Sequence, residues 1–253
     1  MSRTTNTAAI ILRNDPLNGA DARLSFFTAS HGKIDAIARG LQKPTSKLAA
    51  HLEPITLVEL FFIDGRTRRL VGGSVVENRF SVIRSDIRRL FAAGLIVRIA
   101  ELMAPYENTD EQFFSFLLSA LGILDDQTCR EATLRITPHF FAWKLMALSG
   151  YRPTLTHCAV CSRHARSEAV ILFPRRGVVI HENCRATSGS ESGIVLLPAA
   201  LKGLHYMAQA PLEDALRLNT TPSVFSNIAG AIEALMEERF DIAAGGAFWQ
   251  TAV

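Results

Sequence analysis

Three cysteines and one histidine lie at two closely spaced points in the second half of the chain. Cys158 and Cys161 form one pair with two residues between them, and His181 and Cys184 form a second pair with the same spacing. One tight turn can direct both members of such a pair at one ion, and Zn²⁺ prefers a closed tetrahedron of Cys and His ligands. The spacing therefore predicts a structural zinc site formed by these four residues.

The segment between the two pairs has the pattern of a β-hairpin. Val170–Phe173 and Val178–Ile180 are short β-prone runs, and Pro174–Gly177 between them is a turn signal. A hairpin here would bring the second pair beside the first. His164 also lies near the first pair and stays an alternative to His181 as the fourth ligand. Ordinary cysteines that bind no metal are the other interpretation.

Motifs of the common enzyme classes do not occur in the sequence. It contains no G-x-x-x-x-G-K-[ST] phosphate loop, no G-x-S-x-G nucleophile turn and no H-E-x-x-H metalloprotease motif. A zinc deaminase would need H-x-E before P-C-x-x-C and an open position on the metal, whereas here the order is reversed and four ligands close the site. The sequence therefore predicts a protein that is not an enzyme.

Composition indicates a soluble globular protein of one or two domains. The chain has 253 residues, of which 48% are hydrophobic and 20% are charged. Its apolar runs are too short for a membrane span, and Met1–Thr7 lacks the apolar core of a secretory signal. Three of the four cysteines have metal-site spacing, which favours a reducing, cytoplasmic location.

Positive charge is concentrated near the N-terminus. The formal net charge is +3, but residues 1–90 carry 14 Lys and Arg against 8 Asp and Glu. A basic region on a body that is otherwise close to neutral favours a polyanion as partner. A solubilising surface is the alternative.

Residues 8–80 have the pattern of a small β-barrel. Five short β-prone segments are interrupted once, and the predicted strands are Ala8–Arg13, Arg23–Ala29, Lys33–Ala38, Ile55–Ile63 and Leu70–Glu77. Asp64-Gly65 is a hairpin signal, and Gly72-Gly73 marks a bend of the kind that closes a barrel. We expect a five-stranded OB-fold, with an SH3-like barrel as the alternative.

Helical periodicity begins near Ser85 and continues to the C-terminus, apart from the zinc hairpin. Ser85-Asp86 and Thr109–Glu111 are helix-start signals, and Pro138 is expected to kink or divide the helix in which it lies. The predicted class is α+β, with an OB-fold domain at residues 1–80. An all-α domain follows at 81–253, with the zinc element inserted at 158–184.

Basic residues of the predicted barrel are candidates for DNA binding. They lie on the third strand, in the insert after it and at the last hairpin, and they are Lys33, Arg39, Lys43, Lys47, Arg66, Arg68 and Arg69. Such positions can line a groove that follows a nucleic-acid backbone, largely independently of sequence. Stacking faces are expected from at most half of Phe26, Phe27, Phe61 and Phe62, because alternate residues point into a barrel.

An ordered series of short motifs resembles the RecO family of bacterial recombination mediators over essentially the whole chain. The matching segments are Ala9–Arg13, His31–Ile34, Ala38–Gly40, Lys43-Pro44, Lys47-Leu48, Leu148–Pro153 and Cys158–Cys161. The resemblance implies an N-terminal OB-fold and a C-terminal helical domain with a zinc element. Many family members have four cysteines at the metal, so His181 replaces one of them here.

The same resemblance implies a function in recombinational repair of DNA damage. A RecO-like protein binds single- and double-stranded DNA and anneals complementary strands. With RecR, it helps RecA replace single-stranded-DNA-binding protein, whose acidic C-terminal tail it also binds. It acts in the bacterial cytoplasm, associated with the nucleoid.

Two other functions remain open at this point. One is an interaction adaptor that contacts DNA only indirectly, and the other is a zinc-dependent nucleic-acid hydrolase, against which the lack of a carboxylate cluster argues. The oligomeric state, the surface for RecR, the pocket for the acidic tail and the polarity of bound strands do not follow from the sequence.

Overall fold

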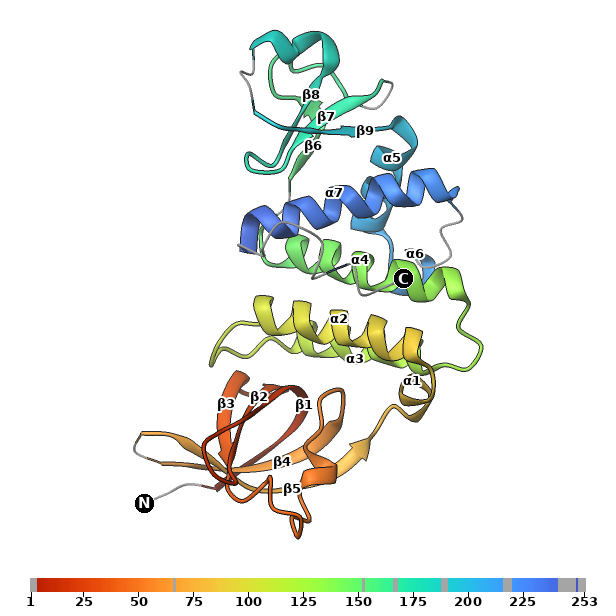
Figure 1. The fold of residues 1–253 in the computed structure, drawn as a ribbon. Helices are drawn as coiled ribbons and strands as arrows, with labels where there is room; N and C mark the ends of the chain where they lie inside the picture. The colour runs from red at the N-terminus through yellow and green to blue at the C-terminus, as the bar shows by residue number, and fades with distance from the viewer. Residues whose placement is uncertain are drawn as a thin grey trace. The chain divides into compact units, whose positions relative to one another are not determined.

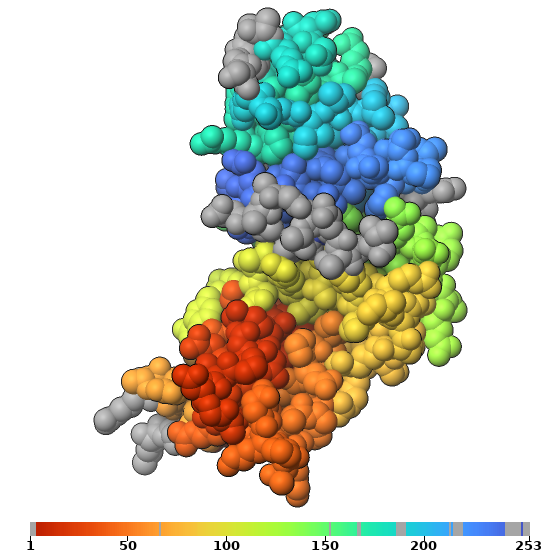
Figure 2. All heavy atoms as spheres, in the orientation of Figure 1, coloured from red at the N-terminus to blue at the C-terminus, as the bar shows by residue number. Residues whose placement is uncertain are grey.

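A computed structural model shows two compact units, which comprise residues 1–129 and 130–253 (Figures 1 and 2). The described residues are 4–65, 67–151, 153–165, 168–187, 191–215, 220–240 and 249. The α+β class predicted from the sequence is confirmed.

The first unit begins with a closed five-stranded barrel. Its strands are β1 (Thr4–Pro16), β2 (Ala22–Thr28), β3 (Gly32–Ala38), β4 (Leu57–Asp64) and β5 (Arg69–Asn78), and a short 3₁₀ helix, η1 (Ala49–His51), precedes β4. The strand order around the barrel is β1-β2-β3-β5-β4, with β3 parallel to β5 and the other pairs antiparallel. The five-stranded OB-fold predicted from the sequence is therefore confirmed.

Alternating side chains fill the barrel. Along β3, every second residue from Gly32 to Ala38 is buried, and the residues between them are half-buried. Phe26 of β2 and Leu60 and Phe62 of β4 belong to the same core and are at most 1% exposed. Removing these apolar surfaces from water supplies the main stabilisation of the barrel.

The seam between β3 and β5 is the weakest part of the barrel. These strands pair at only two positions, Ala36 with Arg69 and Ile37 with Leu70. At the other end of β3, the loop between the second and third helices completes the sheet. The Lys33 N–H donates to the Pro105 carbonyl (3.0 Å), and the Glu107 N–H donates to the Lys33 carbonyl (3.0 Å).

Gly32 permits this loop to approach β3. Its φ angle is +65°, a left-handed conformation that favours glycine, and a Cβ at this position would lie 2.2 Å from the Asn108 carbonyl oxygen. Thr109 adds a hydrogen bond from its hydroxyl to the Ser30 carbonyl (2.8 Å). Loop and strand therefore fit closely only when residue 32 has no side chain.

Three helices complete the first unit: α1 (Ser81–Ser85), α2 (Ile87–Met103) and α3 (Glu111–Asp125). The predicted helix starts are confirmed, because the Asp86 carboxylate accepts from the Arg88 N–H and the Asp110 carboxylate accepts from the Phe113 N–H. Hydrogen bonds of Arg84 and the packing of Phe27 against α3 join these helices to the barrel.

Arg84 of α1 donates to the Pro54 carbonyl (2.8 Å) and to the Thr56 hydroxyl (2.9 Å). The Phe27 ring of β2 packs against Phe113 of α3, with centroids 4.7 Å apart.

The domain boundary predicted at residue 80 falls between β5 and α1, whereas the compact units divide between Cys129 and Arg130. A domain that ends at residue 80 stays a prediction.

The second unit combines helices with a small sheet. Its elements are α4 (Glu131–Leu148), β6 (Thr154–Cys158), β7 (Val170–Phe173), β8 (Val178–His181), η2 (Glu182–Thr187), β9 (Ile194–Leu196), α5 (Pro198–Gln209), α6 (Leu212–Ala215) and α7 (Pro222–Phe240). None of the helices in the described ranges is long and apolar enough to cross a membrane.

Pro138 does not divide α4, which is continuous from Glu131 to Leu148. The helix places Phe140, Phe141 and Trp143 in the core, each at most 2% exposed. Burial of these aromatic side chains offsets the single backbone hydrogen bond that proline cannot make.

The sheet of the second unit has the order β6-β8-β7-β9. The predicted hairpin is confirmed, since Phe173 pairs with Val178 and Val170 pairs with His181. Gly177 closes the turn with a φ angle of +62°, and its N–H donates to the Phe173 carbonyl (2.9 Å). Strands β6 and β9 extend the hairpin to four strands, which the sequence pattern did not indicate.

Gly32→Ala should destabilise the protein by about 1–3 kcal/mol, because alanine must adopt a left-handed backbone and its methyl group overlaps the Asn108 carbonyl. Guanidinium chloride unfolding measures the change. Gly122→Ala is the matched control: Gly122 is an exposed residue inside α3 with open space around it, so alanine should stabilise the protein by about 0.5–1 kcal/mol. Equal stability of the two variants would contradict the close approach of the loop.

Candidate metal centre and nucleic-acid surface

The first ligand pair lies in a tight turn at the end of β6. Cys158 is the last residue of that strand, and its carbonyl accepts a hydrogen bond from the Ser162 N–H (3.0 Å). The Cys158 N–H donates to the Arg163 carbonyl (2.9 Å), and Ser162 has a positive φ of 58°. This geometry reverses the chain within a few residues and directs Cys158 and Cys161 to the same side.

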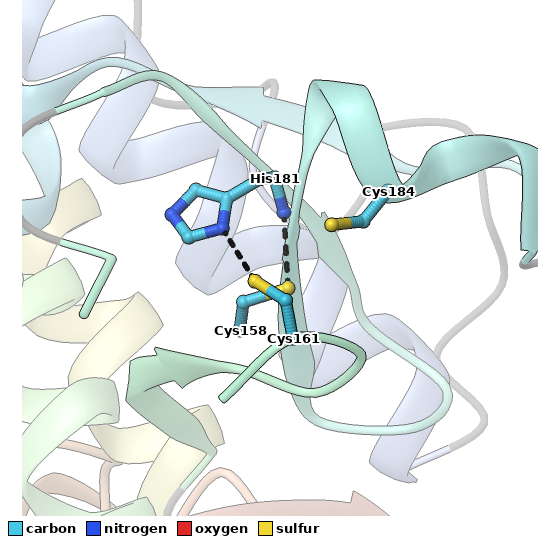
Figure 3. A group of neighbouring side chains, drawn as sticks. All are labelled: Cys158, Cys161, His181 and Cys184. Carbon is cyan, nitrogen blue, oxygen red and sulfur yellow. Dashed lines mark hydrogen bonds between the residues drawn. The ribbon is translucent and has the colours of Figure 1, made fainter. Parts of the chain in front are cut away.

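The second pair follows the hairpin. His181 is the last residue of β8 and Cys184 lies in η2. The parallel pairing of β6 with β8 brings both pairs together, and the three sulfur atoms and the imidazole ring point toward a common centre (Figure 3). The four potential ligand atoms all lie within 4.8 Å of one another. The group predicted from the sequence is therefore assembled in space.

Two contacts orient the His181 ring. Nδ1 lies 3.4 Å from the Cys161 Sγ, and Nε2 lies 3.2 Å from the carbonyl oxygen of His164. A metal-binding histidine commonly donates its second ring N–H to such a carbonyl, which leaves the other nitrogen for the ion. His164 therefore contributes its carbonyl oxygen to the surroundings of the centre. Its imidazole instead faces His157, with ring centroids 4.2 Å apart.

Hydrogen bonds within the cluster change the pKa values of its thiols and its imidazole. A hydrogen bond from the Arg163 side chain lowers the pKa of Cys161 to about 5. Burial raises the pKa of Cys158, but hydrogen bonds from the backbone of Cys161 and His181 outweigh it, so that pKa is lowered. The hydrogen bond with Cys161 raises the pKa of His181. Two thiols are therefore predisposed to be thiolates, and the histidine beside them is stabilised as a cation.

Cys184 differs from the other two thiols, because burial raises its pKa to about 11. A metal ion would have to displace the proton of this thiol on binding. The set fits a tetrahedral ion: bond lengths of about 2.0–2.3 Å place neighbouring ligands about 3.3–3.8 Å apart, and Cys161 Sγ and His181 Nδ1 already have such a separation. An ion held by all four groups would have no open position for water.

The basic residues predicted to bind DNA fall into two groups. Lys33 and Arg69 already have partners within the protein. The Lys33 ammonium donates to the Glu101 carbonyl (2.7 Å). Arg69 forms ion pairs with Asp64 (2.7 Å) and Glu107 (2.6 Å). The other described members are exposed, namely Arg39, Lys43, Lys47 and Arg68. Arg66 lies outside the described residues.

Strand register gathers exposed arginines at one end of the barrel. Arg23 near the start of β2 is opposite Ile37 near the end of β3, and Arg39 follows that strand directly. Arg68 immediately precedes β5, whose first residue pairs with Ala36. Sequence analysis missed Arg23, although its position between the buried Ala22 and Leu24 fits an outward-facing residue. We call Arg23, Arg39 and Arg68 the arginine cluster.

An open groove of about 550 Å³ lies beside the arginine cluster. It is lined by parts of β2, β3, the β4–β5 turn and the α2–α3 loop, and its residues include Arg23, Asp35, Ile37, Arg68, Arg69, Tyr106 and Glu107. The end of β4 and the start of β5 extend beyond the other strands of the barrel (Figure 1). Cations that are accessible at the edge of a groove can hold the phosphates of a flexible strand.

Three of the four phenylalanines considered as stacking faces are buried. Phe26 and Phe62 point into the barrel core, as alternation requires for one residue of each pair. Phe27 points outward, but Phe113 and Phe114 of α3 cover it completely. Only Phe61 of this set is partly exposed. The prediction that at most half of the four offer a stacking face is consistent with this burial, and the packing of α3 leaves Phe61 as the candidate.

Comparisons with known proteins agree over both units. The family model "Recombination protein O N terminal" matches residues 1–77, and "Recombination protein O C terminal" matches residues 84–243. A relative from Dehalococcoides mccartyi (strain ATCC BAA-2266 / KCTC 15142 / 195), named DNA repair protein RecO, is 31% identical over 90% of this chain and 87% of its own length. Relatives with the same name from Roseiflexus sp. (strain RS-1) and Rubrobacter xylanophilus are each 28% identical, covering 92% and 88% of this chain and 80% and 91% of their own lengths.

His181→Ala should abolish stoichiometric metal binding, because it removes one of the four groups that face the centre. His164→Ala is the matched control and should retain the metal, since His164 contributes a backbone carbonyl that alanine also has. Metal content per chain, measured by mass spectrometry after dialysis, separates the two. Loss of metal in the His164 variant alone would contradict this assignment of the ligands.

Proposed function

This chain belongs to the RecO family of DNA repair proteins, and from this premise we propose that it is a DNA-binding recombination mediator without catalytic turnover. The arginine cluster carries the proposal, because it places accessible cations beside an open groove on an OB-fold. Binding through phosphates accounts for action on DNA of any sequence.

We propose that the main DNA-binding surface comprises the arginine cluster together with Lys43 and Lys47. The two lysines lie on the connection after β3, and the Gln42 N–H attaches this connection to the barrel by donating to the Ala20 carbonyl (2.8 Å). Arg66 belongs to the same proposal from the sequence. Lys33 and Arg69 contribute less to it, because Lys33 is engaged by a carbonyl and Arg69 by carboxylates.

Annealing of complementary strands follows from the same electrostatics. Two single strands repel each other through their phosphates, and this repulsion slows their encounter. A surface that neutralises part of one strand and also accepts the product duplex lowers the repulsion and raises the encounter rate. The protein thus accelerates annealing by binding alone, and no group of the chain has to form or break a covalent bond.

The partners we propose come from membership of the family. They are RecR, the acidic C-terminal tail of single-stranded-DNA-binding protein and, indirectly, RecA, which the complex helps to load onto coated single strands. All of these partners act on chromosomal DNA, so we place the protein in the bacterial cytoplasm at the nucleoid. An adaptor that reaches DNA only through such partners is the alternative. Reversing the charge of Arg39 and Arg68 separates direct DNA binding from this adaptor role.

We propose zinc as the metal and a structural role for it. A set of three thiols and one imidazole, two of them buried and two half-buried, suits Zn²⁺, whereas Mg²⁺ and Ca²⁺ prefer oxygen ligands. The ion would join the end of β6 to the end of β8. Between these ends lies the hairpin, and its apolar residues Ile171, Phe173 and Ile180 pack with Cys158. The metal would therefore hold the small sheet together without contacting DNA.

The double variant Arg39→Glu and Arg68→Glu should weaken binding of unrelated single-stranded oligonucleotides by about tenfold or more at 0.1 M salt, because two phosphate contacts are lost and two repulsions appear. The slope of log K against log salt concentration should fall in magnitude by about one to two. Fluorescence anisotropy over a salt series measures both quantities, and the annealing rate should fall in parallel.

Arg175→Glu is the control for this charge reversal. Arg175 lies at the hairpin turn of the second unit with its side chain 80% exposed, so its replacement changes net charge without touching the barrel. DNA affinity should remain within about twofold of the unmodified protein. If the double variant binds DNA as well as this control, the barrel is not the DNA-binding surface and the adaptor role gains support.

Cys158→Ser should lower the melting temperature by about 5 °C or more, because a metal-stabilised sheet loses a buried ligand, while DNA affinity changes little. Differential scanning calorimetry and anisotropy measure the two effects. Cys129→Ser, in the other compact unit, should retain the metal and the melting temperature of the unmodified protein. A variant that loses DNA binding but keeps its thermal stability would contradict a purely structural metal.

A further inference from the structure

Tyr106 is an exposed aromatic residue at the groove beside the arginine cluster. Its side chain is 54% exposed and lines that groove together with Arg23, Arg68 and Ile37. It lies in the α2–α3 loop, outside the five strands of the barrel. Loop and barrel belong to the same compact unit, residues 1–129. An aromatic face that is open to solvent beside cations is the combination that proteins use to bind unpaired nucleobases.

The backbone around Tyr106 is held firmly against β3. Hydrogen bonds join the residues on either side of it to Lys33, one through the Pro105 carbonyl and one through the Glu107 N–H, both at 3.0 Å. The Tyr106 side chain takes no part in these bonds. The ring is therefore attached to the barrel in advance of binding, which reduces the entropy lost when a ligand stacks on it.

Ion pairs hold another part of the groove lining. Arg69 lies between Asp64 and Glu107 at 2.7 Å and 2.6 Å, and Glu107 directly follows Tyr106 in the chain. These carboxylates compensate the charge of Arg69, so the interior of the groove offers no isolated cation for a phosphate. Arg23 and Arg68 are exposed, and the structure shows no ion pair for them among the described residues, so their guanidinium groups are available to phosphates. The groove has one further carboxylate, Asp35, which is half-buried on β3.

Apolar and polar parts of the groove thus suit different parts of one nucleotide. Ile37 is half-buried and, with Ala36, supplies apolar surface in the groove near Tyr106. A base has apolar faces and polar edges, and its phosphate carries the charge. The distribution matches a base within the groove and phosphates at its rim.

We propose that Tyr106 is the stacking platform for one unpaired base of a DNA strand, and that Arg23 and Arg68 bind the phosphates on either side of it. This inference rests on the DNA-binding function proposed above and deepens it. Bases inside a duplex already have both faces stacked, so Tyr106 can contribute only to single strands. The groove thereby gives the protein a preference for single-stranded DNA that charge alone does not provide.

Tyr106→Ala should weaken binding of oligo(dT) by about 5- to 150-fold, the range found when a base-stacking aromatic is removed. Affinity for a duplex of the same length should change by less than about twofold. Tyr106→Phe is the matched control, because it keeps the ring and loses only the hydroxyl, and should bind oligo(dT) like the unmodified protein. Fluorescence anisotropy with the full-length protein measures all of these affinities.

An abasic oligodeoxyribose phosphate of the same length isolates the contribution of the base. The unmodified protein should bind it more weakly than oligo(dT), and Tyr106→Ala should bind both with nearly equal affinity. The salt slope should not change in Tyr106→Ala, since no phosphate contact is removed, but should fall in Arg68→Ala. These readouts separate a stacking role from a general loss of structure, which would lower every affinity.

The outcomes distinguish this inference from the function on which it rests. If the unmodified protein binds DNA and Tyr106→Ala binds oligo(dT) equally well, stacking on Tyr106 is wrong and the proposed function is unaffected. A Tyr106→Phe variant as weak as the alanine variant would overturn stacking in favour of a hydroxyl contact. If the unmodified protein binds no DNA, the proposed function and this inference both fail.

Discussion

Closure of the barrel between β3 and β5 is the constraint on which most of the first unit depends. Two residue pairs join these strands directly, so other segments must satisfy the rest of both edges. The α2–α3 loop bonds to β3 at Lys33, and the segment around η1 covers β5, where His51 lies 3.4 Å from the Ser74 carbonyl. The requirement for glycine at position 32 and the position of Tyr106 both follow from the approach of the α2–α3 loop to β3.

In the second unit, side chains at the strand ends can align the strands of the small sheet. Its small sheet contains strands of only three to five residues, so few residue pairs fix their register. Cys158 and His181 end neighbouring parallel strands, so a shared ion would define their alignment. Arg163 and the carbonyl of His164 hold the ligands in position from the same turn. The protein therefore combines one unit organised by backbone pairing with one that ligand chemistry can organise.

Local features were predictable from the sequence, and features that depend on distant contacts were not. The hairpin, the helix starts and the ligand spacing each involve residues a few positions apart, and the structure contains them as expected. The burial of Phe27, the hydrogen bond of the Lys33 ammonium and the place of Tyr106 beside the barrel depend on contacts between residues about 70 to 90 positions apart in the chain. Charge and aromatic content identified candidate residues, but packing decided which of them are accessible.

Contacts of Phe27 with α3 bear on how the protein can be dissected by truncation. A fragment that ends at residue 80 would expose a phenylalanine that is completely covered by Phe113 and Phe114, and would leave the Lys33 ammonium without the Glu101 carbonyl. The compact N-terminal unit, which includes α3 and therefore these contacts, extends to Cys129. Insolubility of a shorter fragment would report on newly exposed hydrophobic surface, and would say nothing about its affinity for nucleic acid.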